Sequence, residues 1–106
     1  MRNDQVITKM IGIIKKLQNY IQDCTYDQFS SNDMLVEACV FNLGQLGEMA
    51  NKIDEEYEED HPEIPWRQIY GLRNRIIHDY EGINLNLIWE IIKDDLPQLY
   101  KNLEKL

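Results

Sequence analysis

Apolar residues recur at steps of three and four along most of the chain, which is the spacing of amphipathic helices. One stripe runs without a break through the segment from about residue 4 to 23: Ile7, Met10, Ile14, Leu17 and Ile21, widened by Val6, Ile13 and Tyr20. We expect this segment to be a helix with one buried face. The polar run behind it offers Ser31, Asn32 and Asp33 as N-caps for the next helix.

The segment from about residue 33 to 58 is apolar on two sides. One stripe consists of Cys39, Leu43, Leu46, Ala50, Ile53 and Tyr57, and the other of Val36, Val40, Gly44 and Gly47. A glycine inside a helix costs roughly 1 kcal/mol relative to alanine. Close approach of another helix, from the same chain or from a second one, would offset that cost. This helix is therefore predicted to be central or to lie at an interface.

Two more helices are predicted in the second half of the chain. The third runs from Pro65, which suits a first helical turn, to about His78, and its core stripe is Trp66, Ile69, Leu72 and Ile76. Gly82 and Asn84 then supply a turn and an N-cap. The fourth helix carries Leu85, Ile88, Ile92, Leu99, Leu103 and Leu106. Pro97 should kink or split it, with Asp95 available as a cap.

No segment shows the alternation typical of a strand, so the predicted fold is all-α, an antiparallel bundle of four or five helices. A chain of 106 residues is long enough for one core, and we expect a single domain over residues 1–106. Its apolar runs are too short to span a membrane, and the N-terminus lacks the apolar core of a signal peptide. Cys24 and Cys39 have no metal-binding spacing and are expected to be small apolar residues of a cytoplasmic protein.

Charge is distributed unevenly on this chain, whose formal net charge is −8. Residues 54–63, DEEYEEDHPE, carry seven carboxylates and neither lysine nor arginine, which suits a solvated helix end or a docking surface for a basic partner. Residues 65–80 hold three arginines against one aspartate. The acidic body argues against nucleic-acid binding through the whole surface, but a local cationic site remains open.

That cationic segment contains Arg73 and His78, five residues apart. On an ideal helix such residues point about 140° apart, whereas Asn74 and His78 share a face. The Arg–His spacing makes sense if His78 lies at a helix end or if a cleft collects groups from two chains. The simpler alternatives are a histidine that stabilises a helix C-terminus and a surface ion pair between Arg75 and Asp79.

Arginine and histidine in one cleft suit the cleavage of RNA. A guanidinium binds phosphate oxygens with two hydrogen bonds, and an imidazole with a pKa of about 6.5 exchanges protons near neutral pH. RNA carries its own nucleophile, the 2′-hydroxyl, so neither a metal nor an enzyme nucleophile is required. One chain supplies one suitable histidine here, and a twofold dimer would supply two copies of Arg73 and His78.

The stretch HPEIPWRQIYGLRNRIIHDYEGI, followed by IWEIIKDDLPQL, resembles the HepT-like branch of the HEPN superfamily. The hallmark of that family, R-x4-H-x-Y, is matched by Arg73, His78 and Tyr80, with Asn74 at the usual polar position after the arginine. The resemblance extends over essentially the whole chain, since NLGQLGEMA of the second helix also has a counterpart.

This resemblance implies a homodimeric helical toxin of a type VII toxin–antitoxin system, with paired motifs forming one metal-independent endoribonuclease site and no cofactor. Arg73 and His78 would be catalytic and Asn74 would support the cleft. The partner implied is an MntA-like nucleotidyltransferase antitoxin, which would use ATP and Mg²⁺ to attach AMP to Tyr80. The added phosphate would place negative charge beside a groove meant for RNA.

Two questions stay open at this level. The chain could instead be a non-catalytic helical helper subunit of a nucleotidyltransferase complex, which its acidic surface favours mildly. A polar ridge of Gln45, Glu48 and Lys52 could line the cleft, although a solvated face is the simpler interpretation.

Overall fold

The structure, a computed structural model, describes residues 2–78 and 82–106. Its elements in chain order are α1 (Asn3–Tyr20), α2 (Tyr26–Ser30), α3 (Asp33–Ala50), α4 (Glu55–Asp60), α5 (Trp66–Tyr70), α6 (Leu72–Ile76), β1 (Ile77–His78), β2 (Gly82–Ile83), α7 (Leu85–Glu90), the short π-helix η1 (Ile91–Asp95) and α8 (Leu96–Glu104). The predicted all-α class is confirmed, with a two-residue strand pairing as an addition.

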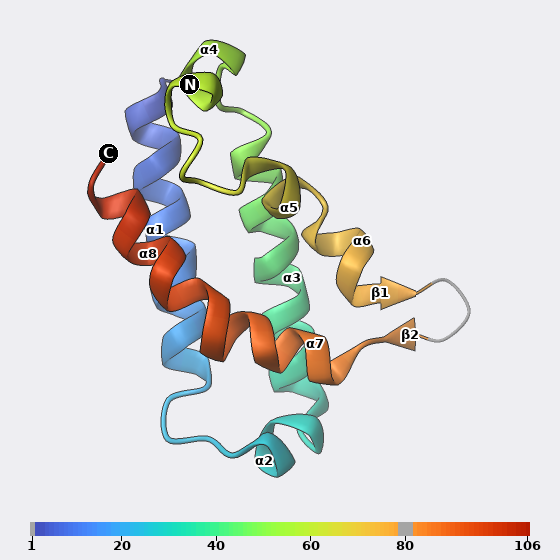
Figure 1. The fold of residues 1–106 in the computed structure, drawn as a ribbon. Helices are drawn as coiled ribbons and strands as arrows, with labels where there is room; N and C mark the ends of the chain where they lie inside the picture. Colours follow the sequence, from blue (N-terminus) through green and yellow to red (C-terminus); the bar gives the residue numbers. More distant parts are fainter. Residues whose placement is uncertain (1, 79–81) are drawn as a thin grey trace.

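The long helices α1 and α3 run antiparallel, and the α7–η1–α8 segment crosses them (Figure 1). α5 and α6 pack on α3, and the β1–β2 hairpin projects beyond them (Figure 1). One hydrophobic core joins these elements. It contains the predicted stripes of the first and third helices: Ile7, Met10, Ile14, Leu17, Ile21, Trp66, Ile69, Leu72 and Ile76.

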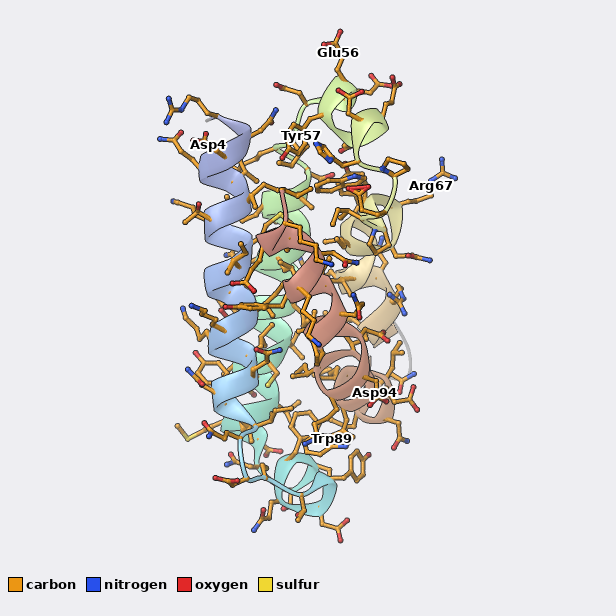
Figure 2. The ribbon with its side chains drawn as sticks, turned by 60° about the vertical axis from the view of Figure 1, so that its left-hand side comes forward. Asp4, Glu56, Tyr57, Arg67, Trp89 and Asp94 are labelled. Carbon is orange, nitrogen blue, oxygen red and sulfur yellow. The ribbon has the colours of Figure 1, made fainter. Side chains whose placement is uncertain are left out.

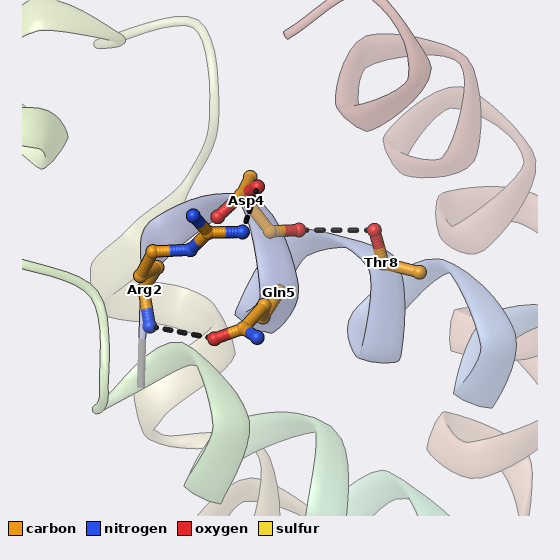
Figure 3. A network of polar contacts seen from close by, with 4 residues as sticks. All are labelled: Arg2, Asp4, Gln5 and Thr8. Atoms are coloured by element: carbon orange, nitrogen blue, oxygen red, sulfur yellow. Dashed lines mark hydrogen bonds and ion pairs between the residues drawn. The ribbon is translucent and has the colours of Figure 1, made fainter.

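Local hydrogen bonds fix the helix starts. At α1 the backbone N–H of Arg2 donates to Oε1 of Gln5 at 3.0 Å, and the hydroxyl of Thr8 donates to the carbonyl of Asp4 at 2.9 Å (Figure 3). Two of the predicted N-caps are confirmed: Asn32 accepts from the N–H of Leu35, and Asn84 from that of Leu87.

The α2 helix, which the apolar pattern did not predict, is held by aromatic packing. Trp89 of α7 lies beside α2 (Figure 2). Its ring centroid is 5.3 Å from that of Phe29 and 5.9 Å from that of Tyr26. Five residues make too short a helix to be stable alone, so this contact with a distant segment accounts for α2.

The prediction of one helix from 33 to 58 was wrong, because the structure ends α3 at Ala50 and starts α4 at Glu55. The break is tied to the start of α1. Asn3 accepts from the N–H of Asp54 at 3.2 Å and donates to the Asp54 carboxylate at 3.3 Å. A pair of bonds between residues 51 positions apart is invisible to local periodicity.

The third predicted helix is also divided, at Gly71, and it ends at Ile76 instead of His78. Ile77 has extended backbone angles, φ −114° and ψ 124°. The carbonyl of Ile76 accepts from the N–H of Asn84 at 2.8 Å, so the hairpin takes a group that a longer helix would have used. The strands pair Ile77 with Ile83 and His78 with Gly82.

The expected irregularity at Pro97 is confirmed, and its form is the π-helix η1 directly before α8. Proline lacks the N–H that a regular helix would use at this position, and π-turns are one way to accommodate such a defect. Asp95 precedes α8 with helical backbone angles and forms no side-chain cap, so its predicted capping role was wrong. None of the helices in the described part of the chain is long and apolar enough to cross a bilayer.

Candidate functional site

A groove of about 440 Å³ lies between α3, α6 and the hairpin. We call it the α3–hairpin groove. It is lined by side chains from α3, by one arginine of α6 and by one isoleucine from each strand: Glu37, Val40, Phe41, Gly44, Gln45, Glu48, Arg73, Ile77 and Ile83. The groove is mainly apolar at its sides, and its charged members are two carboxylates and one guanidinium.

Arg73 enters this groove because of the register of α6. Leu72 and Ile76, on either side of it in the sequence, are buried at 4% and 0% exposure. With that face turned into the core, Arg73 is exposed and projects beside α3. Ile77, four residues after Arg73, lines the same groove.

His78 lies two residues after the end of α6, at the second position of β1, and its backbone pairs with Gly82. Because Ile77 is extended, the 140° separation of an ideal helix does not apply between Arg73 and His78. The expectation that His78 lies at a helix end agrees with this backbone, whereas the expectation that Asn74 and His78 share a helical face was wrong.

Asn74 and Tyr80 are the other residues of the predicted motif. Asn74 is exposed on α6 and is absent from the described residues that line the α3–hairpin groove. Tyr80, the predicted modification site, lies outside the described residues. Asp79, the expected partner of Arg75, also lies outside them.

Helix α3 contributes more to the groove than sequence reasoning proposed. Gln45 and Glu48 of the predicted polar ridge do line it beside Arg73, whereas Lys52 does not. Sequence reasoning missed Phe41, which is 64% exposed, and the strand residue Ile83, which is 39% exposed. The sequence did contain a signal for Phe41: it is a large apolar residue that falls outside both apolar stripes of its helix, so neither stripe would bury it.

The two α3 glycines serve different purposes. A Cβ at Gly47 would meet the carbonyl oxygen of Ile69 at 2.9 Å, so this glycine permits the close approach of α5, as predicted. A Cβ at Gly44 would meet nothing within 4 Å, although Gly44 lies one turn away and lines the α3–hairpin groove. Of these two glycines, Gly47 alone is explained by packing against the residues that the structure describes.

Arg75, two residues beyond Arg73, lies against a different hollow. This second cavity, of about 460 Å³, lies between α5–α6 and η1–α8, and its other charged lining residues are Glu63, Asp94 and Asp95. Asp94 lies on η1, in the segment that crosses α1 and α3 (Figure 2). α6 thus presents one arginine to an apolar groove and the other to an acidic cavity.

The carboxylates of residues 54–63 gather at α4, at the end of the molecule that holds both termini (Figure 1). Glu56 projects outward there (Figure 2). The pKa of Glu58 is raised, first by partial burial and then by the charges of Glu55 and Glu59. This crowding fits the expected solvated acidic helix end.

The cysteines behave as predicted for small apolar residues, since Cys39 is buried and Cys24 half-buried. Burial raises the pKa of the Cys39 thiol to about 11, with a further contribution from Cys24. Over the described ranges, no three His, Cys, Asp or Glu side chains come close enough together to hold a metal ion.

Comparison with known proteins identifies the family. The model of the family described as "Ribonuclease HepT-like" matches residues 10–106. "Putative RNase MJ1380" of Methanocaldococcus jannaschii is 36% identical over 85 residues, which is 80% of this chain and 78% of that protein. "Putative RNase TTE0752" of Caldanaerobacter subterraneus subsp. tengcongensis is 30% identical over 85% of this chain and 89% of its own length.

A protein of Thermococcus cleftensis named "Probable ribonuclease HepT" is 29% identical over 88% of this chain and 84% of its own length. No solved structure matches the chain. The family match extends from α1 to α8 and includes both Arg73 and the α3 face of the groove. With its helical fold, its arginine-containing groove and these relatives together, the chain belongs to the HepT-like ribonuclease family.

Proposed function

We propose that this protein is an endoribonuclease whose active site forms around Arg73 in the α3–hairpin groove. The observation that carries this proposal is that Arg73 is exposed in a groove on α6, the short helix that leads directly into the β1 strand containing His78. Membership of a ribonuclease family supports RNA as the substrate. The names of the relatives, which describe RNases, point the same way.

The chemistry needs no metal. The ribose 2′-hydroxyl loses its proton to a base and attacks the adjacent phosphorus, the bond to the 5′-oxygen breaks, and that oxygen takes a proton from an acid. The products are a cyclic phosphate and a free 5′-hydroxyl. His78 would move the protons, because an imidazole titrates near neutral pH. Arg73 would hold the phosphate and stabilise the charge that grows on its oxygens.

A base and an acid are both required, and each chain has one histidine in its motif. We therefore propose a homodimer in which two copies of Arg73 and His78 form one composite site. Asn74 would support this cleft through hydrogen bonds.

Regulation would act on the same hairpin. A cognate MntA-like nucleotidyltransferase, using ATP and Mg²⁺, would attach AMP to Tyr80, two residues after His78. The added phosphate would compete with RNA phosphate for Arg73, which would silence the enzyme as the toxin of a type VII toxin–antitoxin system.

A second candidate is a non-catalytic helper subunit of a nucleotidyltransferase complex. The acidic surface around α4 favours it, since such a surface could dock a basic partner. In this alternative the protein would bind its partner stably and cleave no RNA under any condition.

The experiment is RNA cleavage by the purified protein with Arg73→Ala and, as matched control, Arg75→Ala from the same short helix. We expect loss of about 10²–10³-fold in rate for Arg73→Ala, comparable to removing one stabilising donor from an active site. Arg75→Ala should cleave at close to the wild-type rate. Equal activity of the two variants would refute the assignment, and loss of wild-type activity in chelator would refute metal independence.

A further inference from the structure

We propose that the surface of α5 is a nucleotide-binding subsite beside the candidate active site. In this subsite Arg67 binds a phosphate of the RNA strand next to the one that is cut, and the ring of Tyr70 stacks on a neighbouring base. The inference rests on the proposed function, because it assigns a second contact for the same RNA. Three features carry it: the charge of the segment, the ridge that joins Arg67 to Arg73, and a hollow beside Tyr70.

The segment from residue 64 to 78 is the cationic part of an acidic chain. It contains Arg67, Arg73 and Arg75 and neither aspartate nor glutamate, whereas the whole chain has a formal net charge of −8. Arg67 is exposed and extends outward from α5 (Figure 2). Among the residues that the structure describes, it forms no ion pair. Its guanidinium is therefore available to a phosphate, an anion that arginine binds with two hydrogen bonds.

Arg67, Tyr70 and Arg73 form a ridge that leads from the outer surface into the α3–hairpin groove. Successive members are three residues apart, the spacing of neighbouring side chains on a helix. Gly71 divides α5 from α6, but its N–H donates to the carbonyl of Arg67 at 3.3 Å and its carbonyl accepts from Arg75 at 2.9 Å. The helical path thus continues across Gly71, and six residues of it rise about 9 Å. A strand whose cut phosphate lies at Arg73 can therefore bring a nearby phosphate to Arg67.

A hollow of about 490 Å³ lies beside this ridge, between α4, the loop that follows it and α5. Its walls include the rings of Trp66 and Tyr70, two prolines and the carboxylates of Glu58 and Glu59. Tyr70 packs against the core with part of its surface and is half-buried, so its ring is held in place while the rest stays accessible. Proteins bind single-stranded RNA by stacking its bases on such rings. The two carboxylates repel a phosphate but accept hydrogen bonds from the amino group of a base, so the hollow suits the base and Arg67 the phosphate.

The acidic helix α4 limits how far the subsite extends. Its residues Glu55–Asp60 include five carboxylates, and Figure 1 shows α5 between α4 and α6. Charges more than about 8 Å apart are largely screened at physiological ionic strength, so α4 acts mainly on a strand that passes beyond α5. The subsite should therefore add one phosphate contact to the active site and not a long binding track.

RNA binding at several salt concentrations tests the phosphate contact without cleavage. The probe is a single-stranded 2′-O-methyl RNA, which has no free 2′-hydroxyl, and fluorescence anisotropy gives its Kd. Arg67→Ala should weaken binding about tenfold and lower the slope of log Kd against log salt by about 0.7, the loss of one phosphate contact. Arg67→Lys should restore the slope because it keeps the charge. Arg75→Ala is the matched control, since Arg75 faces the acidic cavity, and equal binding by Arg67→Ala and Arg75→Ala would overturn the proposal.

Two variants of Tyr70 test the base contact. Tyr70→Leu removes the ring and should weaken binding of the same probe about fivefold or more, whereas Tyr70→Phe keeps the ring and should bind like the wild type. Thermal unfolding of Tyr70→Leu checks that the half-buried position stays folded. Weaker binding by both variants, or by neither, would overturn the stacking role of Tyr70.

A scan with neutral linkages locates the phosphate. Each phosphate of the probe is replaced in turn by a methylphosphonate, which removes one charge. In the wild type we expect one linkage near the cut position to weaken binding about tenfold, and the same replacement should cost Arg67→Ala nothing further. If no linkage shows this coupling, Arg67 contacts no defined phosphate and the proposal fails.

Cleavage kinetics separate the subsite from the proposed active site. Arg67→Ala should raise KM about tenfold and leave kcat within about twofold, because Arg67 binds a phosphate that does not react, whereas Arg73→Ala should lower kcat. Coupled loss of binding at Arg67 in a protein that cuts no RNA supports the subsite and overturns the ribonuclease. An RNA-cleaving enzyme in which Arg67→Ala changes neither Kd nor KM overturns the subsite alone. A wild type that neither binds nor cuts RNA overturns both.

Discussion

The two sides of α3 both carry large apolar residues and a glycine, but these residues have different roles on each side. On the inner side, Leu43 and Leu46 have no exposed surface and Gly47 lies against the backbone of α5. On the outer side, Phe41 is 64% exposed and Gly44 borders an open groove. The helix carries apolar residues on both sides, but among the described residues only those on the inner side are buried.

This difference shows how one helix can serve stability and function together. The inner side fixes the position of α3 in the core, so the outer side can carry residues that the monomer does not need. Changes on the inner side should therefore alter the free energy of unfolding, whereas changes on the outer side should alter association and activity. The following predictions test that division, from the largest effect on stability to the smallest.

Leu46→Ala should have the largest effect. Leu46 is fully buried, and truncating such a side chain costs about 2–5 kcal/mol because a cavity remains. Gln45→Ala, one residue away in the groove, should change stability by less than about 0.5 kcal/mol. Chemical denaturation of the two variants measures their free energies of unfolding. Equal losses of stability would contradict the division of α3 into two sides.

Gly47→Ala should destabilise despite the better helix propensity of alanine. The new Cβ would lie 2.9 Å from the carbonyl oxygen of Ile69, a backbone atom that cannot simply turn away. Strain of about 1–3 kcal/mol should exceed the gain of about 1 kcal/mol in propensity. A lower denaturation midpoint is expected, and a higher one would show that α5 moves freely.

Gly44→Ala should have the opposite sign. With nothing within 4 Å of its Cβ position, alanine is expected to stabilise the helix by about 0.5–1 kcal/mol. Gly12→Ala is the control and should give a similar gain. If alanine destabilised the protein at Gly44 but not at Gly12, other residues of the chain would have to lie against the Cβ position of Gly44.

Thiol reactivity probes the inner side without changing the fold. Burial raises the pKa of Cys39 to about 11, above its ordinary value of 9.0, so its unreactive neutral form persists to higher pH in the folded chain. At pH 8, iodoacetamide should label Cys24 well before Cys39, and denaturant should remove the difference. Mass spectrometry of peptides, with Cys24→Ser as control, checks this. Fast labelling of native Cys39 would indicate an open core.

Much of the fold could be predicted because it depends on local spacing. The stripe from Ile7 to Ile21 is buried as expected, and the caps at Asn32 and Asn84 form as expected. Each of these depends on residues within a few positions of one another. The arginine of the candidate site was identified in the same local way, from its motif.

The sequence by itself determined the helical periodicity, the presence of apolar residues on two sides of the 33–50 segment and the Arg73–His78 motif. Tertiary structure decided where the helices stop, through the bonds between Asn3 and Asp54, which are 51 positions apart, and the bond that Asn84 donates to Ile76 across the hairpin. It also decided that Arg73 shares a groove with Phe41 and Gly44. Periodicity reports which face of a helix is apolar, but only packing determines which apolar face the chain leaves uncovered.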